Sequence, residues 1–150
     1  MKRTFLLILA MAALTIVVLT TGGCNNELFN SKKSSDSILG TWQLASYKYG
    51  SNQSNFIDAS PGQRHIKLIT ETYFTWIITD TITKKVYSAA GGTYTLSGNT
   101  YTESIDFGLG MDTYLGHKHI FTIKVEGDMF FLSGSLADGL KIEEIWQRVK

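Results

Sequence analysis

Short runs of strand-forming residues, separated by turn signals, fill the chain from Ile38 to Lys150. The runs are rich in Thr, Tyr, Ile, Phe and Val, which favour strands, and no stretch repeats its apolar residues at the helical period. Turn signals recur about every 8 to 12 residues, a spacing typical of all-β sandwiches and barrels. We predict eight strands, over residues 40–48, 63–69, 73–80, 90–97, 100–107, 117–126, 129–136 and 140–149.

Two glycine-containing turns set the register of two hairpins. Gly98-Asn99 and Gly127-Asp128 each suit a two-residue turn that needs positive φ. The cross-strand pairs that follow are Leu96–Tyr101, Tyr94–Glu103, Val125–Phe130 and Ile123–Leu132. Because side chains alternate between the two faces of a strand, both registers gather apolar side chains on one face. The predicted inward set is Tyr94, Leu96, Tyr101, Glu103, Ile105, Phe107, Phe121, Ile123, Val125, Phe130 and Leu132.

A third hairpin is expected around a turn at residues 70–72. The pairs that it predicts are Leu68–Phe74 and Ile66–Trp76. This register turns Ile66 inward and places its neighbour His65 on the outer face.

Eight antiparallel strands joined by short turns close most simply into an up-and-down barrel. Closure removes exposed strand edges, and an eight-stranded barrel holds side chains or one small ligand. A two-sheet β-sandwich is the structural alternative. Residues 50–62 form the one long connection, where a short helical turn or lid is expected.

Residues 1–23 have the order of features typical of an export signal. Lys2 and Arg3 supply positive charge, residues 5–19 form an apolar run broken by one Thr, and small residues precede Cys24. Such a segment is removed from the exported protein and takes no part in its fold. The alternative is a transmembrane anchor, which needs about 20 apolar residues.

Cys24 is the only cysteine in the sequence, so it has no disulfide partner. The run Thr21-Gly22-Gly23-Cys24 resembles a bacterial lipobox, with Thr21 at the position where that pattern prefers an aliphatic residue. The resemblance implies that Cys24 becomes the mature N-terminus and carries acyl chains, which together hold a protein firmly on a membrane. The alternative is an incidental cysteine at the end of an ordinary signal peptide.

Residues 24–37 are polar and lack periodicity, so we interpret them as a flexible tether ahead of a domain over residues 38–150. The 14 Lys and Arg nearly balance the 13 Asp and Glu, and no basic cluster is present, so no nucleic-acid partner is expected. We expect the protein in the cell envelope of a Gram-negative bacterium, anchored through Cys24 in the periplasm or at the outer-membrane surface.

The start of the first predicted strand, Gly40-Thr41-Trp42, resembles the Gly-x-Trp signature of lipocalin-type barrels. The resemblance implies that Trp42 closes one end of the barrel and that a basic residue near the end of the last strand, here Arg148, packs over it. The segments that resemble lipocalin-like domains of bacterial envelope lipoproteins are GTWQLASYKYG, RHIKLITETYFTW, GGTYTLSGNTYTESIDFG and IEEIWQRVK. Members of that family are largely without assigned activity, so the resemblance implies a barrel and a binding role.

Glu103 is the residue whose predicted position is most informative. The hairpin register places its carboxylate inside the barrel, opposite Tyr94 and near Tyr101. A buried carboxylate is costly unless it is paired or hydrogen-bonded. Glu103 is therefore either tied to an internal partner or exposed to a wet cavity where it orients a ligand.

Aromatic side chains could form a platform beside this carboxylate. Phe74 and Trp76, with Tyr101, fit the pattern of a mostly apolar pocket with a few polar groups. A packed aromatic core built from the same residues would give the same sequence pattern.

His117 and His119 share a strand face, which the register makes the inner one. With Glu103 they could form a metal site, but no fourth ligand is apparent, and we interpret His119 as part of a polar rim at the barrel mouth. In the last strand, Glu144 and Arg148 face inward together if Trp146 does. The alternative is that Ile145 and Val149 face inward, and the sequence does not decide which of the two faces of this strand points into the barrel.

The sequence contains no Gly-x-Ser-x-Gly, phosphate loop, dinucleotide fingerprint or cysteine nucleophile apart from Cys24. We therefore predict no catalytic residue, metal or cofactor; an acid pair of Glu103 and Glu144 is the enzyme alternative. The first hypothesis is a lipid-anchored binding module that holds a small apolar or mixed-polarity ligand, lipid-like or a glycan fragment. The second is a packed structural or inhibitory envelope protein that acts through a protein partner. The residues predicted to bind the ligand are Phe74, Trp76, Tyr94, Tyr101, Glu103 and His119.

The lipobox resemblance predicts that the protein incorporates labelled palmitate in its own host and that the Cys24→Ala variant does not. Acyl transfer requires the thiol of this cysteine, so the label and the membrane-bound fraction should be lost together. Absence of label from the unsubstituted protein would leave a secreted barrel without an anchor.

Overall fold

The chain forms nine antiparallel strands in residues 37–150, which are the residues that this computed structural model describes. Their bounds are β1 (Gly40–Tyr49), β2 (Ile57–Asp58), β3 (Gln63–Ile69), β4 (Tyr73–Asp80), β5 (Val86–Ser97), β6 (Thr100–Leu109), β7 (Lys118–Glu126), β8 (Met129–Ser135) and β9 (Lys141–Arg148). A short 3-10 helix, η2 (Asp112–Tyr114), precedes β7. The predicted signal segment and Cys24 lie outside the described residues, as does the predicted tether apart from its last residue.

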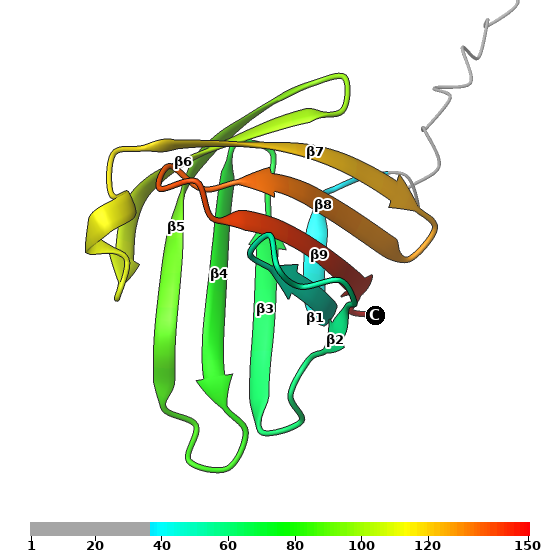
Figure 1. Ribbon diagram of the computed structural model, residues 1–150, viewed down its shortest axis with the longest axis vertical. Helices are drawn as coiled ribbons and strands as arrows, with labels where there is room; N and C mark the ends of the chain where they lie inside the picture. Colours follow the sequence, from blue (N-terminus) through cyan, green and yellow to red (C-terminus); the bar gives the residue numbers. More distant parts are fainter. Residues whose placement is uncertain (1–36) are drawn as a thin grey trace, which may run out of the picture. The chain divides into compact units, whose positions relative to one another are not determined.

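The strands close into a barrel. Neighbours follow chain order from β3 to β9, β1 lies beside β3, and β9 returns to pair with β1 (Figure 1). The predicted eight-stranded up-and-down barrel is therefore confirmed. The long connection carries β2, which pairs with β1 at Ser46 and Tyr47, and not the expected helical turn.

Both glycine-turn hairpins have the predicted registers. Leu96 pairs with Tyr101 and Tyr94 with Glu103 in β5–β6, and the four partners predicted for β7–β8 also pair. Gly98 and Gly127 adopt positive φ angles of 61° and 58°, as such turns require. These registers were predictable because a glycine with positive φ fixes each turn at two residues.

The predicted register of the third hairpin is wrong by one residue. Ile69 pairs with Phe74 and Lys67 with Trp76, because the turn contains only Glu71 and Thr72. A shift of one residue reverses the faces of a strand. Lys67 consequently points inward and is buried, while Leu68 is exposed.

The inward prediction for Phe107 is also wrong. The β5–β6 register shifts between Gly91 and Gly92, so that Asp106 is an extra residue in β6. Such a bulge reverses the side-chain alternation beyond it. Phe107 is 55% exposed and lies over Gly91, where a Cβ atom would collide with its ring. Leu96, beyond the packed part of β5, is exposed as well.

Trp42 and Arg148 lie together at one end of the barrel. Trp42 is fully buried, and its indole Nε1 donates to the Ile38 carbonyl at 2.7 Å. The Arg148 guanidinium carbon lies 4.0 Å from the Trp42 ring centroid. Its two terminal nitrogens donate to the carbonyls of Leu39 and Ser37, at 2.8 and 2.6 Å. Arg148 therefore ties the last strand to the segment that leads into the first.

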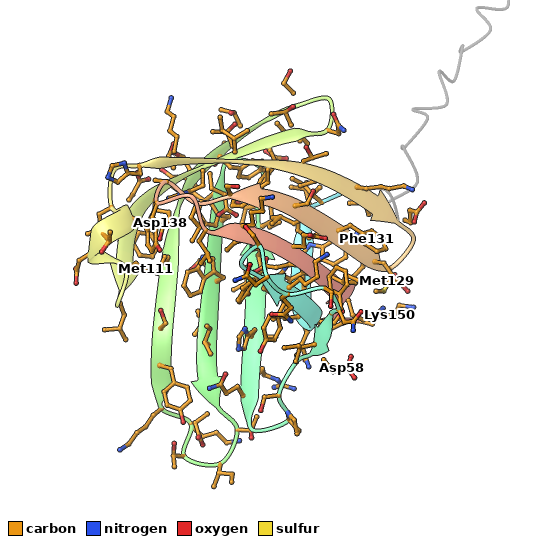
Figure 2. All side chains as sticks on the ribbon, viewed as in Figure 1. Asp58, Met111, Met129, Phe131, Asp138 and Lys150 are labelled. Atoms are coloured by element: carbon orange, nitrogen blue, oxygen red, sulfur yellow. The ribbon has the colours of Figure 1, made fainter. Side chains whose placement is uncertain are left out.

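The two ends of the barrel differ in their connections. The turn end carries Ser37, Trp42, Arg148 and the three short turns after β3, β5 and β7. The loop end carries the connections that follow β1, β4, β6 and β8. Figure 2 shows Met111 and Asp138 near each other at the loop end, and Met129 and Lys150 at the turn end. Within residues 37–150 no helix is long and apolar enough to cross a membrane.

The Arg148→Met variant should lower the free energy of unfolding by about 2 kcal/mol, because two charge-assisted hydrogen bonds and the contact with Trp42 are lost. Lys150→Met is the matched control, since Lys150 forms an exposed ion pair with Asp128. It should change stability by less than about 0.5 kcal/mol. Urea unfolding curves measure both values, and equal losses would contradict the role given to Arg148.

Candidate functional site

A cavity of about 300 Å³ lies inside the loop-end half of the barrel. Its apolar and aromatic lining residues are Trp76, Ile77, Ile78, Ile105, Met111, Phe121, Leu132, Leu136, Leu140, Ile142 and Trp146. Its polar lining residues are Tyr49, His65, Lys67, Ser88, Glu103, Tyr114 and Glu144. Leu140 lies in the loop after β8 and is 39% exposed, so this wall of the cavity reaches the surface.

The turn-end half is packed instead. Its buried side chains do not line the cavity: Ile38, Trp42, Leu44, Ile69, Phe74, Tyr101, Ile123 and Phe130. The Trp42 and Phe130 rings lie 5.3 Å apart, and the Tyr94 and Tyr101 rings 5.0 Å apart. A second hollow, of about 590 Å³, lies between exposed residues such as Arg64 of β3 and Lys84 of the β4–β5 loop and lacks an apolar enclosure.

An ion pair between Lys67 of β3 and Glu103 of β6 forms part of the cavity wall. Lys67 Nζ lies 3.1 Å from Glu103 Oε1, and the two side chains are only 4% and 5% exposed. The same ammonium lies 5.2 Å from the centroid of the Trp146 ring. Burying either charge alone would be costly, so each residue makes the other tolerable inside the barrel.

Glu144 of β9 is held by two neutral donors. The Tyr49 hydroxyl donates to Oε1 at 2.7 Å, and the Trp146 indole donates to Oε2 at 2.9 Å. Burial raises the pKa of the Tyr49 hydroxyl, and the negative charge of Glu144 raises it further, so Tyr49 remains a donor. Burial lowers the pKa of His65, an effect that the charge of Glu144 partly offsets.

Two buried groups lie next to Glu103 without lining the cavity. His119 pairs with Glu103 across β6 and β7 and is 1% exposed. Its Nδ1 accepts from the Ala137 amide at 3.2 Å, which leaves the proton of the neutral ring on Nε2, without a partner in the described structure. Burial lowers the pKa of His119, and the Glu103 charge opposes that shift.

Tyr101 is fully buried, and its hydroxyl has no hydrogen-bond partner among the described residues. Burial raises the pKa of this hydroxyl, and the nearby negative charge of Glu103 raises it further, although the two groups make no hydrogen bond in the structure. Tyr101 and His119 therefore surround Glu103 with neutral groups, which makes its ion pair with Lys67 more important.

The structure places two of the six predicted ligand-binding residues, Trp76 and Glu103, in the cavity lining. Phe74 and Tyr101 lie in the packed half, and His119 lies behind Glu103. Tyr94 stands at the turn end, where its hydroxyl donates to the Thr70 carbonyl at 2.6 Å. Inward residues of one strand thus differ in their surroundings along its length. Those nearer the turn end face the packed core, and those nearer the loop end face the cavity.

His117 is exposed and precedes β7, so it does not share the inner face with His119 as expected. Residues 37–150 contain no group of three His, Cys, Asp or Glu side chains placed to hold a metal. The sequence did not decide which side chains of β9 face inward. In the structure Ile142, Glu144 and Trp146 do, and they line the cavity. Glu144 and Arg148 do not pair, since Arg148 is bound at the turn end.

Sequence reasoning missed Tyr49, His65 and Lys67 as cavity residues, and it gave the inward orientation of Glu144 as one of two alternatives. A signal was present in the alternation of His65 and Lys67 with the apolar residues between them. The predicted register places these two side chains on the outer face, because a buried lysine is tolerated only beside a partner such as Glu103. That partner lies three strands away, in β6.

A family model described as "Domain of unknown function (DUF4488)" matches residues 37–150. The chain belongs to this DUF4488 family. A lipocalin-like protein from Bacteroides uniformis is 20% identical to the DUF4488 chain, with a TM-score of 0.51 over 74% of this chain and 97% of that one. An uncharacterized protein from Bacteroides eggerthii is 12% identical, with a TM-score of 0.50 over 75% and 100% of the two chains. No curated protein matches the sequence. The lipocalin-like fold inferred from the sequence is thereby confirmed for this DUF4488 domain.

The Lys67–Glu103 pair predicts a non-additive pattern of stability. Glu103→Leu or Lys67→Met alone should lower the free energy of unfolding by about 3 kcal/mol, because each leaves one uncompensated buried charge. The double variant should lie within about 1 kcal/mol of the unsubstituted protein, since no charge remains. Urea unfolding of the four proteins gives the coupling energy. Additive losses would contradict the ion pair.

Proposed function

We propose that this DUF4488 protein is a non-enzymatic binding module that holds a small ligand of mixed polarity in the loop-end cavity. The observation that carries the proposal is the cavity itself, at about 300 Å³. This volume lies at the lower end of the range for small-molecule sites. An eight-stranded barrel is also wide enough to enclose one small ligand.

The lining supports a binding role because it is mostly apolar with a few placed polar groups. Trp76 and Trp146 supply large flat surfaces, while Tyr49, Glu144 and the Lys67–Glu103 pair supply hydrogen-bonding groups. The two carboxylates are each engaged by protein donors, Glu103 by Lys67 and Glu144 by Tyr49 and Trp146. Carboxylates held in this way are better suited to holding a bound ligand in place than to acting as general acids or bases.

The packed alternative would place the function on the outside of the barrel. Phe56 and Phe131 line a shallow outer hollow over β7, β8 and β9, next to Ile145. The interior is packed only in its turn-end half, however, and the loop-end half would be filled in a purely structural barrel. The internal cavity therefore favours a ligand over a protein partner.

We also propose that the barrel works in the cell envelope, held to a membrane through acyl chains on Cys24. The described chain begins at the turn end, where Arg148 binds the Ser37 carbonyl. A flexible tether would therefore join the barrel at the end opposite the cavity and would not cover the loop end. The site would then be free to receive a ligand that passes near the membrane surface.

Native mass spectrometry of the protein purified from its own host tests the binding role. The unsubstituted protein should retain a small molecule, and Trp76→Ala should lose it because a large aromatic part of the cavity lining is removed. Tyr73→Ala is the matched control on the same strand, since Tyr73 is 57% exposed and lies outside the cavity. It should keep the ligand. Loss from both variants, or no bound molecule in the unsubstituted protein, would favour a partner-binding surface.

A further inference from the structure

The charges of the cavity wall do not balance. Lys67, Glu103 and Glu144 are its formally charged residues, and Lys67 is paired with Glu103 at 3.1 Å. Within the described part of the chain, no lysine or arginine nitrogen lies within 4.0 Å of the Glu144 carboxylate. Glu144 is therefore the one carboxylate of this wall without a positive partner.

His65 is the other group that could neutralise Glu144. Among residues 37–150 its side chain makes one hydrogen bond, from Nε2 to Gln63 at 3.2 Å, and forms no ion pair with the Glu144 carboxylate. Burial lowers the pKa of His65 more than the charge of Glu144 raises it, and the ring is neutral near neutral pH. The cavity wall consequently keeps a net negative charge.

We infer that the ligand is an organic cation, with an ammonium group that binds Glu144 and an apolar body that fills the rest of the cavity. This inference rests on the proposed function, because it requires the cavity to be a ligand site. Each carboxylate oxygen can accept more than the one hydrogen bond that Tyr49 or Trp146 donates to it. Both oxygens therefore keep acceptor capacity for ammonium N–H groups.

The aromatic lining favours the same ligand class. Tyr49, Trp76, Tyr114 and Trp146 all line the cavity, and aromatic faces attract cations. One such contact already exists, since the Lys67 ammonium lies 5.2 Å from the centroid of the Trp146 ring. The wall thus combines a fixed carboxylate with rings that tolerate a buried positive charge.

An anionic ligand of the same shape would be disfavoured. Its carboxylate would lie in a mostly apolar cavity whose net charge is already negative, where like charges repel more strongly than in water. Lys67 offers little compensation because its charge is engaged by Glu103. The cavity should therefore reject fatty acids and accept alkylamines.

Isothermal titration with three probes that share one alkyl chain tests this inference: octylamine, octanol and octanoate, near neutral pH. Octylamine should bind about tenfold more tightly than octanol, and octanoate most weakly. Glu144→Gln should reduce octylamine affinity about tenfold and leave octanol affinity within about twofold. Retained octanol binding shows that the variant is folded and its cavity intact.

Glu143→Gln is the matched control, because Glu143 is the adjacent residue, lies outside the cavity and pairs with Lys48 at 2.8 Å. It should leave all three affinities unchanged. Octanoate binding as tight as octylamine binding would overturn the inference while leaving the binding module in place. So would a Glu144→Gln variant that loses amine and alcohol affinity equally. Failure of all three probes to bind the unsubstituted protein would overturn both proposals, and the probe ranking decides the matter even if Glu144→Gln does not fold.

Discussion

The pairing of β1 with β9 is the constraint on which the rest of the structure depends. It joins the first and last strands from Trp42–Arg148 to Tyr49–Ile142 and removes the two edges that an open sheet would expose. Arg148 strengthens this junction by binding the Leu39 and Ser37 carbonyls and covering the Trp42 ring. Without closure, the inward side chains of β3 and β6 would not face each other across an interior.

Closure alone would not divide the interior into a packed half and a hollow half. The division follows from where large side chains and charges lie along the strands. Trp42, Phe74, Tyr101 and Phe130 fill the turn end, whereas the loop end holds the Lys67–Glu103 pair and more widely spaced side chains around a space of about 300 Å³. Because a buried charge needs its partner, the pair fixes the inward face of both strands and gives one cavity wall its polar character.

The sequence predicted what is local and missed what depends on distant contacts. The Gly98-Asn99 and Gly127-Asp128 turns specified their registers, since positive φ restricts both residue type and loop length. The turn at residues 70–72 has no glycine, so the sequence does not specify its length. The predicted register is therefore shifted by one residue, which places Lys67 on the wrong face of β3. Trp76 and Glu103 were predicted as cavity residues from strand alternation. Placing Tyr49 in the cavity, and choosing between the two possible orientations of Glu144, required knowledge of which strands meet at closure.

The central claim is that a ligand enters the barrel at its loop end, and the three tryptophans of the chain test it directly. Trp76 and Trp146 line the cavity, whereas Trp42 is buried at the turn end. In ¹⁵N-labelled protein titrated with octylamine, nuclear magnetic resonance should show saturable shifts of the Trp76 and Trp146 indole N–H signals and a nearly constant Trp42 signal. Unchanged signals from Trp76 and Trp146 at saturating probe, or shifts confined to residues of the outer hollow such as Phe131, would contradict the account.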